Sequence, residues 1–218
     1  MKTRLAIFDL DGTLADTITD IALTMNAVLA VRGYPTFELD DYRRFVGNGV
    51  AQLSRRVLPE KDADLSPKLV GEFRELYPGR MFDNTQPFPG IPEVLDSLAE
   101  AGVGLAVLSN KPHDMTTKMC ARLFDRWSFE PVWGQMPEWA VKPDPSAALE
   151  IARLRGVDPA NCVFVGDSGV DMATGKAAGM RSLGVLWGFR GREELLEDGA
   201  DSLCSKPLEL IESIAPKN

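Results

Sequence analysis

The stretch Leu5-Ala6-Ile7-Phe8-Asp9-Leu10-Asp11-Gly12-Thr13 decides the fold, because an unbroken apolar run ends there in two acids and a glycine. An apolar run of this length is typical of a parallel strand that is buried on both faces. In open α/β sheets, ligands bind at the carboxyl ends of the strands. Two carboxylates this close repel each other and lose hydration on burial, so Asp9 and Asp11 predict a bound cation or a chemical task at the strand end.

The composition argues against several classes of protein. The chain has 218 residues, 44% hydrophobic and 26% charged, which fits one globular core with a small insert. A formal net charge of −8 argues against a nucleic-acid partner. No apolar stretch is long enough to span a membrane, and Asp9 interrupts the N-terminal apolar run too early for a signal peptide. Cys120, Cys162 and Cys204 are too far apart for a zinc pattern, and they indicate a reducing cytoplasm.

Strand-like and helical patterns alternate along most of the chain. The expected strands are Leu5–Phe8, Val103–Leu108, Cys162–Val165, Ser182–Leu186 and Ala200–Cys204. Helical patterns over Pro92–Ala101 and Pro145–Arg155 begin at a proline and are followed by a glycine. Alternating β and α elements with apolar strands predict an α/β fold, a doubly wound, Rossmann-like parallel sheet covered by helices on both faces.

One long segment breaks this alternation. From Asp16 to about Phe82 the sequence contains no convincing strand. Asp16 is a candidate N-cap, and apolar residues keep helical spacing from there to Gly33. Shorter helical patterns follow at Leu39–Val46, Val50–Leu58 and Pro67–Tyr77. The sequence therefore predicts a helical domain at residues 16–82, inserted in a core made of residues 1–15 and 83–218.

Four groups of polar residues lie at or near predicted strand ends. They are Asp9/Asp11/Thr13, Ser109-Asn110, Lys142 in Val141-Lys142-Pro143-Asp144-Pro145, and Gly166-Asp167-Ser168-Gly169-Val170-Asp171. The carboxyl ends of parallel strands meet at one edge of a sheet, so these residues are expected to converge there.

Together the four groups resemble the motifs of the haloacid dehalogenase superfamily of phosphotransferases, and the resemblance covers nearly the whole chain. The helical insert lies where that superfamily has its cap domain. The resemblance implies that Asp9 is a nucleophile that forms an aspartyl-phosphate. It implies that Asp11 is the general acid that protonates the leaving alcohol and then the base that activates water.

The same resemblance implies a magnesium site and a phosphate site. Mg²⁺ would be held by the carboxylates of Asp9 and Asp167 and by the backbone carbonyl of Asp11, with Asp171 as a supporting or additional ligand. The residues implied to hold the phosphoryl oxygens are Thr13, Ser109, the backbone amide of Asn110, and Lys142. Lys142 would also offset the charge of the transferring group.

Within the superfamily, the chain is most similar to the phosphoglycolate phosphatase group with a helical cap. The residues that carry this likeness are Val46-Gly47-Asn48-Gly49, Asn110-Lys111-Pro112, Ala178-Gly179-Met180 and Trp187-Gly188-Phe189. The likeness implies hydrolysis of a small phosphorylated metabolite, with 2-phosphoglycolate as the best single substrate. Gly47 and Asn48 are then either a loop that contacts substrate or only a turn between two cap helices.

Other functions and oligomeric states stay open at this point. A phosphomutase, a pyrophosphatase, a nucleotidase and a non-catalytic binding protein could share the fold, and the oligomer could be a monomer or a small homo-oligomer. Lys111 is close to Ser109-Asn110 in the sequence and could aid phosphate binding, but a surface position is its default expectation. His113 is expected in a surface or capping role. The arginines Arg43, Arg44, Arg55 and Arg56 are expected on a solvated helix face.

Overall fold

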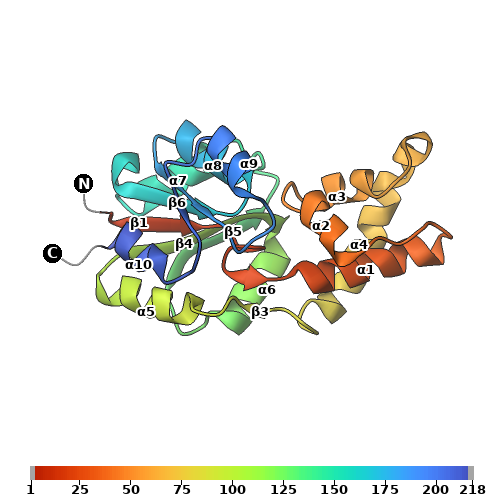
Figure 1. The fold of residues 1–218 in the computed structure, drawn as a ribbon, viewed down its shortest axis with the longest axis horizontal. Coiled ribbons are helices and arrows are strands. Elements are labelled where there is room, and N and C mark those ends of the chain that lie inside the picture. The colour runs from red at the N-terminus through yellow and green to blue at the C-terminus, as the bar shows by residue number, and fades with distance from the viewer. Residues whose placement is uncertain (1–2, 216–218) are drawn as a thin grey trace.

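A six-stranded parallel sheet forms the centre of the computed structural model, which describes residues 3–215 (Figure 1). The strand order is β5-β4-β1-β6-β7-β8. The strands are β1 (Leu5–Phe8), β4 (Gly104–Pro112), β5 (Phe129–Gln135), β6 (Cys162–Gly166), β7 (Arg181–Val185) and β8 (Ser202–Cys204). The apolar strand β1 lies in the middle and pairs with β4 on one side and β6 on the other. Its carboxyl end therefore lies between theirs.

Helices cover both faces of this sheet, which confirms the doubly wound prediction. The side chains of β1 alternate: Leu5 and Ile7 pack in a cluster with α7, while Ala6 and Phe8 pack in a cluster with α5 and α6. Figure 1 shows α7, α8 and α9 on one side and α5, α6 and α10 on the other. Their bounds are α5 (Ile91–Glu100), α6 (His113–Leu123), α7 (Ser146–Leu154), α8 (Gly169–Ala177), α9 (Arg192–Glu197) and α10 (Glu209–Ile214), with a 3₁₀ turn η2 (Pro159–Asn161) before β6.

The sequence-based prediction was wrong for two strands of the sheet, β4 and β5. Strand β4 continues to Pro112, so Ser109 and Asn110 lie within the strand and not after it. Strand β5 was not predicted, because Phe129–Gln135 contains Pro131 and Gly134, which are atypical of strand interiors. It is an edge strand with an irregular register against β4, and an edge position tolerates a proline.

Four helices fill the segment between two short strands, β2 (Ala15–Asp16) and β3 (Gln86–Pro87). They are α1 (Ile18–Val31), α2 (Leu39–Phe45), α3 (Val50–Arg56) and α4 (Ser66–Arg80), with a 3₁₀ helix η1 (Glu60–Leu65) between the last two. They pack on one another and lie together beyond one end of the sheet (Figure 1). The N-cap prediction for Asp16 is wrong: Asp16 pairs in β2, and Thr17 precedes the helix. The domain boundaries at residues 16 and 82 stay predictions.

Asp20 fastens the two segments that lead into and out of these helices. Its carboxylate accepts hydrogen bonds from the backbone and side-chain amides of Asn84 at 3.0 and 2.8 Å. It also accepts from the backbone amide of Thr85 at 2.9 Å and its hydroxyl at 2.7 Å. Burial raises the pKa of Asp20, but these hydrogen bonds outweigh it, so the pKa lies below its ordinary value. The start of α1 is therefore held to the segment that enters β3.

The helices are short, the longest being α4 with 15 residues and α1 with 14. Within residues 3–215, none is both long and apolar enough to cross a membrane.

Candidate active site

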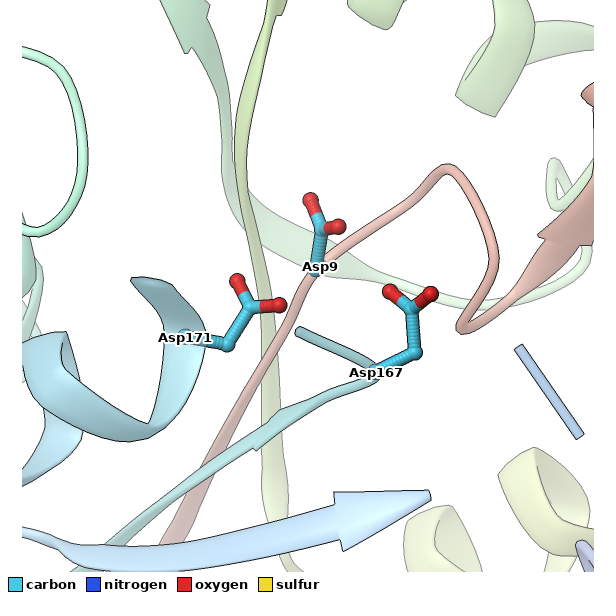
Figure 2. A group of neighbouring side chains, drawn as sticks. All are labelled: Asp9, Asp167 and Asp171. Carbon is cyan, nitrogen blue, oxygen red and sulfur yellow. The ribbon is translucent and has the colours of Figure 1, made fainter. Parts of the chain in front are cut away.

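Three buried aspartates meet at the carboxyl edge of the sheet. Asp9 follows β1, Asp167 follows β6, and Asp171 lies in the first turn of α8. One carboxylate oxygen of each lies within 4.8 Å of the others. Figure 2 shows the three side chains beside one another, coming from these separate elements. The structure thus brings together the two carboxylates predicted to hold a metal and the predicted supporting aspartate.

Lys142 is the cation of this cluster. Its Nζ lies 2.8 Å from Asp9 Oδ1 and 2.6 Å from Asp171 Oδ1, and its side chain is 3% exposed. Burial lowers the pKa of Lys142, but the two aspartates outweigh it and raise that pKa above its usual range, so the lysine is charged. Apart from this ion pair, Asp9 Oδ1 is buried without a hydrogen-bond partner in the described chain. Lys142 therefore pairs with two of the three clustered carboxylates, and Asp167 is not one of them.

The cluster carries more negative charge than its surroundings neutralise. Burial and the Asp171 charge outweigh Lys142 and raise the pKa of Asp9 to about 6. Burial, Asp171 and Asp9 likewise raise the pKa of Asp167 well above its ordinary value. Carboxylate oxygens are the ligands that Mg²⁺ prefers, and a divalent cation would relieve this repulsion. The close approach of one oxygen each from Asp9, Asp167 and Asp171 fits such an ion.

The backbone near Asp167 is crowded, and glycine is required there. Gly12 has a φ of +88°, and a Cβ on it would collide with the Asp167 carboxylate. The Asp167 carboxylate accepts a hydrogen bond from the Phe189 backbone amide at 2.7 Å and from the Thr13 hydroxyl at 3.3 Å. Thr13 is thus placed at the aspartate cluster and does not line the cavity described below. These contacts fix the orientation of Asp167.

Ser109 and Asn110 of β4 form the next part of the site. Ser109 is buried and lines the cavity beside Asp9. The Asn110 side chain accepts a hydrogen bond from the Lys142 backbone amide at 2.9 Å and donates to the Lys142 carbonyl at 3.2 Å. It also donates to the carbonyl of Gly47 at 3.3 Å, across to the helical segment. Asn110 therefore positions the lysine loop and touches the segment that closes over it.

Lys111 is buried in the site, so the expectation that it lies at the surface is wrong. Its Nζ lies 3.0 and 3.2 Å from the two carboxylate oxygens of Asp11 and 2.9 Å from the hydroxyl of Tyr77 on α4. Burial lowers the pKa of Lys111, but Asp11 and Tyr77 outweigh it and raise that pKa above its usual range. The Asp11 side chain is thus held by a lysine and lies outside the cluster of Asp9, Asp167 and Asp171.

A cavity of about 50 Å³ lies between the sheet edge and the helical segment. Asp9, Asp11 and Ser109 form its polar end. Its apolar wall comes mainly from the helices and includes Ile21, Val50, Leu53, Phe73 and Tyr77. By the space that one buried water needs, the cavity has room for roughly four water-sized groups. Any molecule bound there in this arrangement is small.

Gly47 and Asn48, the two predicted loop residues, differ in their position relative to the cavity. Gly47 lines the cavity. Asn48 does not, and its side chain accepts a hydrogen bond from Arg56 at 2.9 Å. Arg43 does not line the cavity either; it donates to the Gly188 carbonyl at 3.0 Å and so links α2 to the segment after β7.

The sequence reasoning missed Tyr77 and gave a place in the site for Lys111 only as the alternative to a surface position. Lys111 directly follows Ser109-Asn110, and the unpredicted extension of β4 is what turns it inward. Tyr77 keeps helical spacing with Phe73, so it could be read only as core. Only the packing of α4 over the sheet edge shows that its hydroxyl reaches Lys111.

Comparison with known proteins gives consistent matches. The model of the haloacid dehalogenase-like hydrolase family matches residues 6–185. Phosphoglycolate phosphatase of Xylella fastidiosa (strain 9a5c) is 34% identical over 94% of this chain and 90% of its own length. Phosphoglycolate phosphatase of Aquifex aeolicus is 32% identical over 95% of both chains. A crystal structure from Lactobacillus delbrueckii subsp. bulgaricus, provisionally assigned as a phosphoglycolate phosphatase, superposes with a TM-score of 0.92 over 100% of both chains at 29% identity.

Proposed function

This chain belongs to the haloacid dehalogenase-like hydrolase family, and we propose that it hydrolyses a small phosphate monoester through a phosphorylated Asp9. Phosphatase chemistry is the activity that the family and the relatives named above have in common. The observation that carries the proposal is the position of Asp9, a buried carboxylate at the end of the central strand, beside Lys142 and facing the cavity that also holds Asp11.

The first half of the proposed reaction transfers the phosphoryl group to the protein. An oxygen of Asp9 attacks phosphorus, and the bond between phosphorus and the leaving oxygen breaks. Asp11 gives its proton to that oxygen, so the product leaves as an alcohol. Lys142 and the polar groups of Ser109 and Asn110 offset the charge on the phosphoryl oxygens.

The second half returns the protein to its starting state. Asp11, now a carboxylate, takes a proton from a water molecule, and the water oxygen attacks phosphorus. The bond between phosphorus and the Asp9 oxygen breaks, and inorganic phosphate leaves. Both steps need Asp11 near the same phosphoryl group, which fits its position in the same cavity as Asp9.

Magnesium is the cofactor that we propose, with Asp9 and Asp167 as ligands, the Asp11 carbonyl as a third, and Asp171 supporting the site. When bound, Mg²⁺ offsets the charge of the phosphoryl group and of the clustered carboxylates. Thr13 and the Phe189 amide hold Asp167 in place, and Ser168 holds Asp171 by hydrogen bonds to its Oδ2 at 2.5 and 3.1 Å.

The substrate that we propose is 2-phosphoglycolate, and residues 16–82 are the cap that selects it. The names of the relatives support this substrate, and the small cavity supports a small leaving group. We place the protein in the cytoplasm as a monomer or small homo-oligomer. Its three cysteines are free and buried, which fits a reducing compartment.

Phosphate release tests the proposal. The protein is incubated with 2-phosphoglycolate and a panel of other phosphorylated metabolites, with Mg²⁺ and with EDTA, and inorganic phosphate is measured. We expect Mg²⁺-dependent release, with the highest kcat/KM for 2-phosphoglycolate. If inorganic phosphate were released from none of the esters, the phosphatase proposal would be rejected and a binding protein favoured. Transfer of phosphate within a sugar phosphate would favour a mutase.

A further inference from the structure

The cavity presents one positive charge on a wall that is otherwise mostly apolar. Among the described residues that line it, Lys111 is the only cation. The surface facing it includes Ile21, Val50 and Phe73, which come from three different helices. A second charge or a row of hydroxyls on a ligand would find no partner on such a wall. Beyond the phosphoryl group at its polar end, the cavity therefore suits one further anionic group on a short carbon body.

Tyr77 supplies an unused donor next to this cation. Its hydroxyl oxygen accepts from Lys111 Nζ at 2.9 Å, and nothing in residues 3–215 accepts the hydroxyl proton in turn. The residue is 1% exposed, and burial raises the pKa of Tyr77 to about 12, so it keeps that proton. An ammonium and a hydroxyl side by side at the cavity match the two oxygens of a carboxylate.

Lys111 is buried and has room for a second anionic partner on its cavity side. Its side chain is 4% exposed, and among the described residues Asp11 is the acid that pairs with it. Asp11, Lys111 and Tyr77 all line the cavity, so a negative group on a bound molecule lies within reach of the ammonium and of the Tyr77 hydroxyl. A charge-assisted hydrogen bond to such a group is stronger than one to a neutral group.

We propose that Lys111 and Tyr77 bind an anionic group of the leaving alcohol, namely a carboxylate on the carbon next to the ester oxygen. The inference rests on the proposed function, because it names the substrate group that the same site reads. Asp11 must reach the ester oxygen, and Lys111 Nζ lies only 3.0 Å from Asp11, so the recognised group lies close to that oxygen. An uncharged alcohol offers no anionic acceptor to Lys111 and Tyr77, so the site selects against it.

The test compares 2-phosphoglycolate with ethyl phosphate, which has the same number of carbon atoms and no carboxylate. We expect wild-type kcat/KM to favour 2-phosphoglycolate by about a hundredfold or more, since ethyl phosphate lacks the group that Lys111 and Tyr77 would bind. Lys111→Met lowers both rates, because Lys111 also holds Asp11, but the ratio of the two should fall at least about tenfold. Tyr77→Phe should lower the ratio several-fold, mainly through KM for 2-phosphoglycolate.

Two further variants complete the design. Lys111→Arg keeps the charge and should retain part of the preference, and the exposed Lys118→Met on α6 is the matched control that should leave the ratio unchanged. An unchanged ratio in Lys111→Met, or in Tyr77→Phe if the methionine variant does not fold, would overturn the inference. Wild-type hydrolysis of both esters without preference would also overturn it, while leaving the phosphatase proposal intact. If the wild type hydrolysed neither ester nor any other in the panel, the proposed function itself would be rejected.

Discussion

Two lysines lie buried at the carboxyl edge of the sheet, Lys111 in β4 and Lys142 in the loop between β5 and α7, and their surroundings differ. Lys142 lies between Asp9 and Asp171, so its partners all come from the sheet domain. Lys111 lies between Asp11 at the sheet edge and Tyr77 on α4 of the helical segment. The proposed nucleophile and metal ligands are thus positioned by the sheet and its connections, whereas Lys111 and the proposed acid and base Asp11 lie beside a residue of the helical segment. Changes at the first site should affect all substrates alike, and changes at the second should depend on the substrate.

The largest effect is expected at the Lys142 site, for Asp9→Asn. An amide is nearly isosteric with the carboxylate but cannot attack phosphorus, so kcat should fall at least about 10⁴-fold for every ester. The thermal unfolding midpoint reports whether the variant folds, and it should not fall, since the substitution removes one of three crowded charges. If the variant turned over within about tenfold of wild type, a loss of only ~1.4 kcal/mol, Asp9 would not be the nucleophile.

Metal removal should come next in size. EDTA should lower the rate about 10³-fold for charged and uncharged esters alike, and Mg²⁺ should restore it. Ca²⁺ should not replace Mg²⁺, because it takes more ligands at longer distances and would displace the Asp9 oxygen. Isothermal titration of Mg²⁺ provides a second measurement, and Asp167→Asn should weaken that binding. Full activity in EDTA would count against the metal site.

Asp11→Asn should have a smaller effect that divides the two half-reactions. The variant cannot protonate a leaving alkoxide or deprotonate water, so steady-state turnover should fall about 10²-fold or more. Nitrophenolate leaves without a proton, so p-nitrophenyl phosphate should still phosphorylate Asp9 and then stall. Stopped-flow absorbance should show a burst that approaches one nitrophenolate per protein.

The matched substrate for the Asp11→Asn variant is an alkyl phosphate, whose alcohol needs the proton. Quenched-flow analysis of released alcohol should show no burst with it, because the first step is now slow as well. The same trace for both substrates, with no trapped phosphoprotein, would exclude Asp11 as the shared acid and base.

The same contrast between the two lysine sites explains what the sequence could predict. Asp9, Asp167 and Lys142 follow or precede regular elements, and the carboxyl ends of parallel strands meet at one edge, so pattern alone brings them together. Lys111 and Tyr77 are 34 residues apart on elements whose relative position depends on packing between the helical segment and the sheet. No periodicity encodes that packing, so their contact could not be predicted.

Strand β5 and the hydrogen bonds of Asp20 were both not predicted, and the two causes are similar. Strand β5 contains a proline and a glycine, and its strand geometry depends on pairing with β4. Asp20 reads as an ordinary acid in the first turn of a helix, a position that the helix dipole favours. Its four hydrogen-bond donors belong to Asn84 and Thr85, 64 and 65 residues later, and local sequence gives no hint of them.

The smallest effect on chemistry is expected for Asp20→Asn, which tests how the helical segment is held. Asp20 does not line the cavity, so the variant should keep kcat within about threefold of wild type when folded. An amide cannot accept all the hydrogen bonds that the carboxylate accepts from Asn84 and Thr85, so the free energy of unfolding should fall by about 1–3 kcal/mol. Asp83→Asn, at a neighbouring exposed position, is the matched control and should change it little.

The pH dependence of this loss gives the sharper test. The folded protein holds the pKa of Asp20 below the ordinary value of 3.8, because the hydrogen bonds from Asn84 and Thr85 outweigh burial. The stabilisation is therefore complete above pH 3.8 and disappears as the pH falls through the lower pKa of the folded state. Urea unfolding of wild type and Asp20→Asn near neutrality and at stepwise lower pH should show two stabilities that converge only in strong acid. A constant difference across that range would mean that Asp20 acts through its shape, and that its charge does not hold the two segments together.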